Sequence, residues 1–459
     1  MKPNIIVFFS DDHAQWALPS YGNREISAPH ISDLAETGAV MDNAFTPCPV
    51  CSPARASFWT GLYPSQHGVH DHLAEDDPEV GATPWLQGIP TLAEYLRDAG
   101  YTSAMCGKWH CGAGERPKSG FDYWYSSWRK TPKYSTMANK YSDQGRVVER
   151  TGYDTRIITD AVIDFLRGRD GEKPFFLFIG YATTHNPWIN RDQGLVSRYR
   201  NATFGDIPDD IPYAFGEPGT HPVAPDDPGE ALAQYYASVT MIDDAVGRVL
   251  DELADERAET LIVYTSDHGL NMGHHGIWGK GNGSVPLNML EESIRVPLIL
   301  NHPGQITGGQ RRAERVNHCD LFMSLLDFAD ARPQAADRFP GKSFRRMLDG
   351  GDVAGWDNAT IVEYGNVRAI RDARYKLVQR QDGYQNLLHD LVRDPRETVN
   401  LYRDPQCQDI VRRLTGALES FFAGYEVAER SGLRADDLPV HNRNEAWRSK
   451  NTSGERRLV

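Results

Sequence analysis

Four short apolar runs stand out along the chain, and each one is followed at once by a polar cluster. The runs occupy positions 4–10, 101–106, 175–181 and 260–266. Uninterrupted apolar runs of this length are typical of strands that are buried on both faces of a sheet. In open α/β sheets, binding and catalytic groups lie just past the carboxyl ends of such strands. The pattern therefore predicts a buried sheet with one functional edge.

Apolar residues at helical spacing predict the helices that cover this sheet. Segments 92–99, 155–167 and 231–256 fit that spacing. In the third segment the apolar residues recur with the period of a helix and form a core-facing stripe. Together with the apolar runs, these segments indicate an α/β fold.

The chain divides into three parts in this interpretation. A large α/β domain covers residues 1–355, and a smaller subdomain of strands and one helix covers 358–428. Residues 429–459 are polar and charged, so they form either a disordered end or an arm that contacts a partner subunit in a homo-oligomer. Segments 184–230 and 268–286 are predicted to be long loops over the strand ends, and loops of this length are usually functional.

The composition of the chain limits which binding partners and which cellular compartment can be expected. The chain has 459 residues and a net charge of −14, which makes nucleic acid and anionic membranes poor partners. No apolar stretch reaches the length of a membrane span, and the run at 4–10 is too short for a signal peptide. We therefore expect a cytoplasmic protein, or a periplasmic one if a signal was removed.

The six cysteines do not form the pattern of a disulfide framework in a chain of this length. Cys48 and Cys51 make a C-x-x-C pair, but Cys106 and Cys111 are separated by four residues without the turn residues of a zinc knuckle. Structural zinc is therefore only a minor alternative.

Charged and imidazole side chains follow the predicted strands. Asp11 and Asp12 follow the first run, and Asp267 and His268 follow the last. Adjacent carboxylates after a buried strand are costly unless a cation neutralises them, so a metal site is indicated. The two middle runs lead to basic residues: Lys108, His110 and His185.

The segment Cys-Ser-Pro-Ala-Arg-Ala-Ser-Phe-Trp-Thr-Gly, from Cys51 to Gly61, predicts a short helix. Pro53 suits the first turn of a helix, and Gly61 suits its end. Cys51 would then lie at the helix N-terminus, where backbone N–H groups and the dipole favour an anion. The alternative is a buried structural cysteine in front of this helix.

This Cys-x-Pro-x-Arg pattern resembles the signature of the formylglycine-dependent (type I) sulfatases, and further residues match that family. The matched metal ligands are Asp11, Asp12, Cys51, Asp267 and His268, and the matched catalytic residues are Cys51, Arg55, Lys108, His110, His185 and Lys280. His268 stands where many members carry Asn. The resemblance implies an alkaline phosphatase-like fold, with a large mixed sheet flanked by helices and a smaller C-terminal α+β subdomain.

The resemblance also implies a cofactor and a modification. A formylglycine-generating enzyme would oxidise Cys51 to formylglycine, and the hydrated aldehyde would attack the sulfur of a sulfate monoester. The ligand set is mostly hard oxygen donors, for which we expect Ca²⁺, with Mg²⁺ or Mn²⁺ as alternatives.

The family resemblance also implies a separate role for each of the basic residues. Arg55 and Lys108 would orient the hydrated aldehyde, and His110 would deprotonate its second hydroxyl. His185 and Lys280 would hold the sulfate and protonate the leaving alcohol.

The two long loops suggest the substrate. Asn186, Trp188, Arg191 and Trp278 lie in them and offer stacking and hydrogen bonds of the kind that hold a sugar. We expect a small sulfated mono- or oligosaccharide. The alternatives are an aryl or alkyl sulfatase, a phosphonate monoester hydrolase or phosphodiesterase of the same superfamily, and a non-catalytic protein that binds sulfated glycans.

Overall fold

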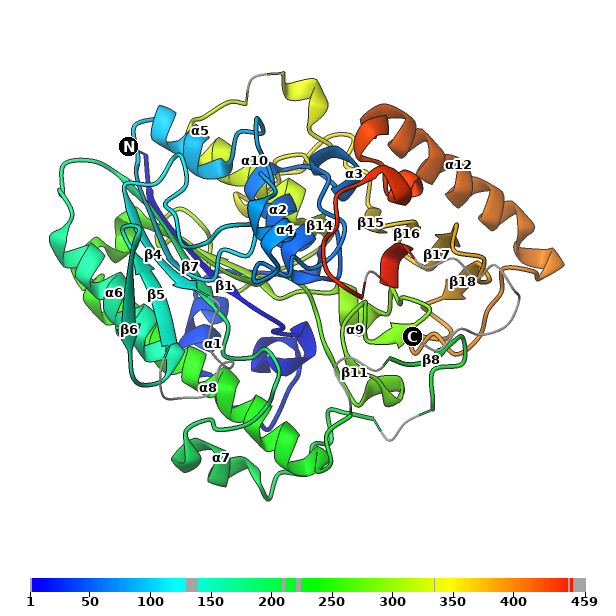
Figure 1. Ribbon diagram of the computed structural model, residues 1–459, viewed down its shortest axis with the longest axis horizontal. Coiled ribbons are helices and arrows are strands. Elements are labelled where there is room, and N and C mark those ends of the chain that lie inside the picture. Colours follow the sequence, from blue (N-terminus) through cyan, green and yellow to red (C-terminus); the bar gives the residue numbers. More distant parts are fainter. Residues whose placement is uncertain are drawn as a thin grey trace.

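A ten-stranded mixed sheet forms the centre of the molecule (Figure 1). The computed structural model describes residues 2–128, 139–208, 211–219, 224–333, 335–444 and 446–448. From edge to edge the strands are β14 (Gln310–Asn317), β2 (Ala39–Phe45), β13 (Leu298–Asn301), β9 (Thr260–Ser266), β1 (Asn4–Ser10), β7 (Phe175–Tyr181), β3 (Thr102–Gly107), β4 (Tyr123–Trp128), β5 (Asn139–Asp143) and β6 (Arg146–Arg150).

The central strands are parallel and end level with one another. β1 pairs in parallel with β9 and β7, and β7 pairs in parallel with β3. Ser10, the last residue of β1, lies opposite Ser266 and Tyr181. Antiparallel strands such as β13 and β5 extend this centre on both sides. The predicted α/β fold with a large mixed sheet is confirmed.

Glycine is required where β3 ends. Gly107 lies opposite Gly180 with φ +108, and a Cβ at Gly107 would lie 2.2 Å from the Gly180 carbonyl oxygen. Any other residue would clash there and strain the backbone. The close approach of these two strands directs the next residue, Lys108, past the sheet edge.

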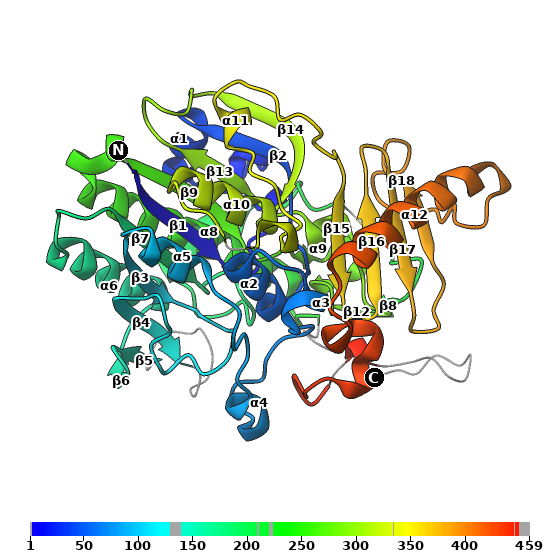
Figure 2. The same ribbon diagram turned by 90° about the horizontal axis from the view of Figure 1, so that it is seen from above.

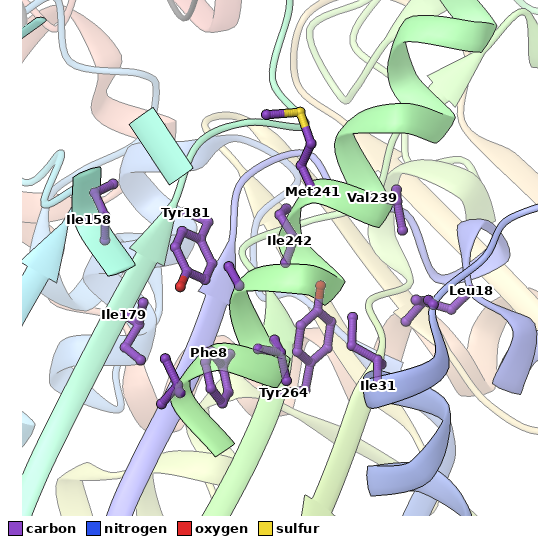
Figure 3. Packing of buried hydrophobic residues seen from close by; sticks show 14 of the residues in the cluster. Phe8, Leu18, Ile31, Ile158, Ile179, Tyr181, Val239, Met241, Ile242 and Tyr264 are labelled. Carbon is purple, nitrogen blue, oxygen red and sulfur yellow. The ribbon is translucent and has the colours of Figure 1, made fainter. Parts of the chain in front are cut away.

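Helices cover both faces of the sheet because successive side chains of β1 point to opposite faces. Ile6 and Phe8 belong to one buried cluster with α1, α6 and α8 (Figure 3), whereas Val7 and Phe9 belong to another with α2, α5 and α10. The helices are α1 (Pro29–Glu36), α2 (Cys51–Thr60), α3 (Pro64–His67), α4 (Pro78–Ala82), α5 (Leu92–Asp98), α6 (Asp154–Gly168), α7 (Gln193–Tyr199), α8 (Pro228–Glu252), α9 (Glu291–Ile294), α10 (His318–Phe328) and α11 (Arg345–Leu348). Short 3-10 helices are η1 (Gln15–Ala17), η2 (Pro19–Tyr21), η3 (Ala254–Glu259), η4 (His274–Gly276), η5 (Ala336–Arg338) and η6 (Pro405–Cys407).

A second, four-stranded antiparallel sheet forms the C-terminal subdomain (Figure 2). Its elements are β15 (Thr360–Tyr364), β16 (Val367–Arg371), β17 (Tyr375–Arg380), β18 (Leu387–Asp390) and the helix α12 (Gln408–Tyr425). One face, with Leu377, packs on α12 residues such as Leu418. The other face, with Val378, packs on Val50 and Met289 of the large domain. The subdomain therefore supports segments next to Cys51. The exact boundaries at 355 and 358 stay a prediction.

The predicted elements agree closely with the structure. All four predicted strands are present, and their bounds agree with the predicted ones within one residue. The bounds of α5 and α6 also agree with the predicted ones within one residue. The helix α8 ends at Glu252 instead of 256, and the chain continues there as η3.

The predicted loops contain short elements. Segment 184–230 includes α7, because Asp192 accepts hydrogen bonds from the N–H groups of Gly194 and Leu195 and the helix buries an apolar face. Segment 268–286 contains β10 (Asn271–Met272) paired with β11 (Trp278–Gly279), and β12 (Ser284–Val285) paired with β8 (Glu217–Pro218).

Beyond α12 the chain continues as what we call the C-terminal arm, residues 426–444 and 446–448. It contains η7 (Ala428–Arg430), η8 (Gly432–Asp437) and η9 (Ala446–Arg448). The arm lies against its own chain: Trp447 is fully buried and its ring stacks on His70 with centroids 5.3 Å apart. Residues 449–459 of the predicted tail lie outside the described residues. A homo-oligomer through this tail stays a prediction.

Within the described ranges, none of the helices combines the length and the apolar character needed to cross a membrane.

Candidate active site

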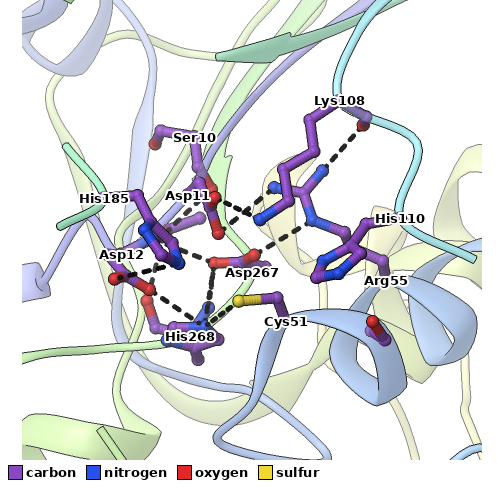
Figure 4. Close-up of polar contacts among 12 residues, drawn as sticks. Ser10, Asp11, Asp12, Cys51, Arg55, Lys108, His110, His185, Asp267 and His268 are labelled. Atoms are coloured by element: carbon purple, nitrogen blue, oxygen red, sulfur yellow. Dashed lines mark hydrogen bonds and ion pairs between the residues drawn. The ribbon is translucent and has the colours of Figure 1, made fainter. Parts of the chain in front are cut away.

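The residues predicted from the strand ends come together at one edge of the sheet (Figure 4). Asp11 and Asp12 directly follow β1, and Asp267 and His268 directly follow β9. Because β1 and β9 are adjacent and parallel, the two pairs meet: the Asp12 N–H donates to Asp267 Oδ1 at 3.1 Å. The predicted cluster of carboxylates therefore exists.

Cys51 is the first residue of α2, as predicted. The backbone before it is extended at Val50, and the helix ends at Gly61 with φ +69. A Cβ at Gly61 would lie 2.5 Å from the ring of Phe322, so both the conformation and the packing require glycine. Cys51 is 2% exposed. The N-terminus of a buried helix thus presents its side chain to the site.

Arg55 and Lys108 hold the carboxylates of Asp11 and Asp267. Arg55 Nε donates to Asp267 Oδ2 at 3.0 Å, and its Nη2 lies 3.7 Å from Asp11 Oδ1. Lys108 Nζ donates to Asp11 Oδ2. Burial alone would raise the pKa of Asp11, but Lys108, His185 and Arg55 hold it well below its usual range. Asp11 is therefore a carboxylate in the folded protein.

Lys280 connects Asp12 to Cys51. Its Nζ donates to Asp12 Oδ1 at 2.6 Å and to Cys51 Sγ at 2.8 Å. The side-chain amide of Asn288 donates to the Lys280 carbonyl at 2.9 Å and fixes the backbone of this turn. Burial alone would lower the pKa of Lys280, but Asp12 above all raises it well above its usual range. Lys280 is thus a buried cation directed at the predicted nucleophile.

Each of three site histidines has one ring nitrogen tied to a backbone carbonyl. These contacts are His268 Nδ1 to Gly269 at 2.8 Å, His185 Nδ1 to Asn186 at 2.7 Å and His110 Nε2 to Leu73 at 3.1 Å. A carbonyl oxygen only accepts, so the tied nitrogen carries the proton, and in a neutral ring the other nitrogen has the lone pair. His268 Nε2 lies 3.2 Å from Asp12 Oδ1 and 3.3 Å from Cys51 Sγ, and burial lowers the pKa of His268 to about 3.

The Cys51 thiol is a weak nucleophile as it stands. Burial and then the Asp11 carboxylate raise its pKa to about 12, against the opposing effect of Lys108 and Lys280. A thiol with such a pKa carries almost no thiolate at neutral pH, and the thiolate is the reactive form.

The arrangement of ligand atoms fits a divalent cation. Two overlapping groups could hold one, with atoms within 4.8 Å of each other: Asp11, Asp12, Cys51 and His185 in the first, and Asp11, Cys51, Asp267 and His268 in the second. Burial and the adjacent Asp11 raise the pKa of Asp267 well above its usual range, so the local positive charge does not fully compensate both carboxylates. A bound cation would supply that charge. His185 is an additional candidate ligand that the sequence did not assign to the metal.

Among the described residues, Cys51 is the only cysteine in such a ligand group. Cys48 and Cys106 are buried and form no disulfide.

The residues predicted to bind a sugar lie near the site but are largely buried. Trp188 and Trp278 are 6% and 9% exposed, with ring centroids 5.8 Å apart. The Arg191 guanidinium donates to the carbonyls of His185, Pro187 and Ile189. It therefore supports the backbone that carries His185. The Asn186 carbonyl accepts the His185 ring N–H. Their role toward substrate stays a prediction.

Sequence reasoning missed the groups that act through backbone contacts. Thr184 Oγ1 donates to the Asp11 carbonyl, and Ser52 Oγ accepts from the Leu73 N–H at 2.9 Å. The position of Thr184 beside His185 was the only signal for it. The sequence carries no sign of the Leu73 carbonyl, because every residue has one.

Comparison with known proteins decides the family. The sulfatase family model matches residues 3–331, and a model described as "N-sulphoglucosamine sulphohydrolase, C-terminal" matches residues 273–423. The chain belongs to the sulfatase family. The enzyme class expected from the sequence, a sulfatase, is thereby confirmed.

Curated sulfatases and solved structures resemble this chain over most of its length. The N-acetylglucosamine-6-O-sulfatase of Bacteroides thetaiotaomicron is 25% identical, covering 87% of this chain and 83% of that protein. The choline-sulfatase of Rhizobium meliloti is 28% identical, covering 88% and 83%. A solved structure in complex with its substrate D-glucosamine-2-N,6-O-disulfate has a TM-score of 0.82 at 24% identity, covering 93% of this chain and 98% of that one. The last likeness shows the shared fold.

Proposed function

We propose that this sulfatase hydrolyses a sulfate monoester of a mono- or oligosaccharide, with the hydrated formylglycine form of Cys51 as its nucleophile. The observation that supports this most directly is the position of Cys51. It begins a buried helix in the family signature and lies 2.8 Å from Lys280 Nζ and 3.3 Å from His268 Nε2. Oxidation of the Cβ thiol to an aldehyde, which hydrates to two hydroxyls, replaces a weak nucleophile by an oxygen that can be activated.

In the first step, one hydroxyl of the hydrated aldehyde gives its proton to the Asp267 carboxylate and attacks the sulfur, and the bond between sulfur and the leaving oxygen breaks. The leaving alcohol takes a proton from Lys280, or from His185 when its ring is also protonated at Nε2. Both residues lie on the Asp12 side of Cys51. Arg55 and Lys108 orient the attacking group through the Asp11 and Asp267 carboxylates.

In the second step, the remaining hydroxyl loses its proton to His110. The bond between carbon and the sulfate oxygen then breaks, sulfate leaves, and the aldehyde forms again. The Nε2–H of His110 is tied to the Leu73 carbonyl, so Nδ1 is the nitrogen that can accept this proton.

A divalent cation held by Asp11, Asp12, Asp267 and His268 would acidify the attacking hydroxyl and neutralise the sulfate oxygens. Oxygen donors dominate this set, which favours Ca²⁺ over Mg²⁺ or Mn²⁺ if coordination is irregular.

The carbohydrate substrate is supported by the relatives of this chain. The N-acetylglucosamine-6-O-sulfatase is similar over most of its length, and the C-terminal model is named for an N-sulphoglucosamine sulphohydrolase. The similarity to a choline-sulfatase favours a small alkyl sulfate as the second candidate.

The first experiment tests the nucleophile. The protein is produced with a formylglycine-generating enzyme, and the peptide that contains Cys51 is analysed by mass spectrometry. We expect a mass about 18 Da below that of the cysteine peptide, since an aldehyde replaces the thiol. Cys51→Ser should lose nearly all sulfatase activity, whereas Cys48→Ser, a buried cysteine outside the ligand groups, should retain it. Full activity from unmodified thiol contradicts the proposal.

The second experiment tests the reaction class. Hydrolysis of a nitrophenyl sulfate is compared with that of a matching aryl phosphonate monoester under the same conditions. A higher kcat/KM for the sulfate supports the proposal, and a clear preference for the phosphonate would make the protein a phosphonate monoester hydrolase.

A further inference from the structure

The C-terminal arm packs against a segment that touches the catalytic centre. This segment, residues 70–74, lies between the arm and the start of α2. On the arm side, the His70 N–H donates to His441 Nε2 at 3.0 Å, and the His70 ring Nε2 contacts the Arg430 carbonyl at 2.7 Å. His70 is fully buried. The arm therefore packs directly against residues 70–74.

Asn442 and His441 fix the backbone on both sides of Leu73. The side-chain amide of Asn442 donates to the His72 carbonyl and to Asp71 Oδ2, each at 3.0 Å. The Ala74 N–H donates to the His441 carbonyl at 2.9 Å. Asn442 is 3% exposed. Buried hydrogen bonds of this kind are costly to leave unmade, so they define one backbone position.

Leu73 itself connects the two sides of the active site. Its N–H donates to Ser52 Oγ, and Ser52 is the neighbour of Cys51. Its carbonyl accepts from His110 Nε2. One peptide unit therefore joins the arm to the ring that we assign to the second step.

The Leu73 carbonyl determines which nitrogen of His110 is basic. As long as Nε2–H donates to it, a neutral ring has its lone pair on Nδ1. A shift of this carbonyl would release the ring or change its tautomer. Partners that orient a functional histidine in this way typically contribute 10–100-fold to activity.

We propose that Asn442 and His441 are positioning residues for His110: the arm holds the Asp71–Ala74 backbone so that the Leu73 carbonyl keeps His110 in its working orientation. The proposal rests on the function proposed above, in which His110 serves the release of sulfate. It assigns a role in the reaction to a segment about 330 residues away from His110 in the chain, counted from their positions.

The test compares two truncations in the arm. Asn442→Ala removes the donor to residues 71 and 72. Leu438→Ala is the matched control, because Leu438 is a buried arm residue whose side chain packs with Val362 and Trp447. If Asn442 positions His110, release of sulfate slows and becomes limiting. kcat and KM then fall together by about tenfold, kcat/KM is unchanged, and enzyme carrying one SO₃ group accumulates in the intact mass spectrum.

A merely structural role gives a different result. It lowers the fraction of active enzyme, so kcat falls at constant KM and no sulfated enzyme accumulates. That result for Asn442→Ala, or an equal accumulation in Leu438→Ala, overturns the proposal.

A second pair of variants tests the proposal in case the Asn442→Ala protein folds poorly. Asn442→Asp keeps the shape but places a carboxylate against Asp71, and it should show the same defect. Adding Asp71→Asn restores a donor and an acceptor between residues 71 and 442 but not the donor to the His72 carbonyl, so it should recover part of kcat. Failure of the double variant to recover, with both proteins folded, counts against the proposal.

Hydrogen exchange separates this proposal from the proposed function. In the Cys51→Ser protein, which cannot carry formylglycine, Asn442→Ala should speed exchange at the amides of Leu73 and Ala74, and Leu438→Ala should not. Unchanged exchange overturns the arm contact whatever the chemistry is. If the wild-type protein has neither formylglycine nor sulfatase activity, the proposed function fails, and that failure is visible without any arm variant.

Discussion

The ammonium group of Lys280 lies 2.8 Å from Cys51 Sγ and 2.6 Å from Asp12 Oδ1. It thereby joins the predicted nucleophile to a predicted metal ligand. The lysine is carried by the turn after β11, and its side chain is only 9% exposed. A buried cation in this position can stabilise negative charge that develops on a transferred sulfate group, because few water molecules screen it.

Removing this charge should slow the reaction strongly. Lys280→Met keeps most of the side-chain volume but not the ammonium group, and we expect kcat/KM to fall by about 10²–10³-fold. Steady-state kinetics on a nitrophenyl sulfate measures this. Lys342→Met is the control, because Lys342 is half exposed and pairs with Asp357, and it should leave kcat/KM unchanged. A Lys280→Met enzyme as active as the control would show that Lys280 only balances the charge of Asp12.

A divalent cation should stabilise the folded protein through the aspartate cluster. Chelation is expected to abolish activity and to lower Tm, because a metal that binds only the folded site stabilises it. In Asp267→Asn the site is weakened, so the shift of Tm on chelation should be smaller than in the wild type. Asp244→Asn, at an exposed position on α8, should keep the full shift. Equal Tm values with and without metal in the wild-type protein would exclude the cation site.

Much of this site could be predicted because its residues follow buried strands. The apolar runs placed Asp11, Lys108, His185 and Asp267 at strand ends, and the family resemblance implied their roles. Parallel pairing brings such strand ends to one edge. The start of α2 at Cys51 followed from Pro53 and Gly61, whose conformational preferences are local. Local conformational preferences of this kind are kept in the folded protein where no tertiary contact works against them.

The remaining features depend on contacts between distant segments. Arg191 was predicted to contact a sugar, which stays a prediction, but the donation of its guanidinium to three carbonyls of its own loop was not predicted. For residues 429–459 the sequence offered a disordered end or an arm that contacts a partner, and it did not predict that Asn442 hydrogen-bonds to the His72 carbonyl of the same chain. Backbone acceptors leave no trace in a sequence, so neither pairing could be found from residue types.

The two site histidines should have distinguishable defects. His110→Ala removes the base for the second hydroxyl, so the sulfated enzyme should accumulate and be detectable by intact mass. His185→Ala should slow formation of that ester, and more for alcohols that leave poorly, because His185 lies on the Asp12 side with Nε2 3.9 Å from Asp12 Oδ2. Single-turnover kinetics with a good and a poor leaving group measures both steps. A sulfated intermediate trapped by His185→Ala and not by His110→Ala would require the two roles to be exchanged.

The contact between the large domain and the C-terminal subdomain should weaken in acid. Glu291 of α9 lies 3.1 Å from Lys376 Nζ and 3.3 Å from Arg371 Nη2. Burial alone would raise its pKa, but Lys376, Arg371 and Arg295 hold the pKa at about 2, below the ordinary value of 4.5. Because the folded pKa is depressed, this group stabilises the fold above pH 4.5, and that contribution, up to ~3 kcal/mol, is lost as the pH falls toward 2.

Glu397 shares Lys376, and burial raises its pKa to about 7, so it stays protonated in the folded protein below pH 4.5. The window below that pH therefore separates the titration of Glu291 from that of Glu397. Glu291→Gln should be less stable than the wild type at neutral pH, but its Tm should fall less between pH ~4.5 and ~3. Glu149→Gln, at a mostly exposed position, should follow the wild type. A Glu291→Gln variant with the same acid-induced fall in Tm would show that other carboxylates cause it.

The substrate prediction is tested by comparing classes of sulfate ester. Trp188 and Trp278 pack against each other, and each is close in the sequence to a site residue, His185 or Lys280. We expect this pair to offer an apolar surface to a sugar ring. A panel of sulfated glucosamines and disaccharides should therefore contain one with a kcat/KM far above that of choline sulfate or a nitrophenyl sulfate. Trp278→Ala should lower kcat/KM for that saccharide by about tenfold more than for the aryl sulfate, because only the larger substrate reaches the indole. Trp356→Ala, whose indole N–H donates to the Arg315 carbonyl, serves as the control for loss of a tryptophan. If choline sulfate or an aryl sulfate is the best substrate and Trp278→Ala affects all esters equally, the carbohydrate assignment is wrong while the membership of the sulfatase family is unaffected.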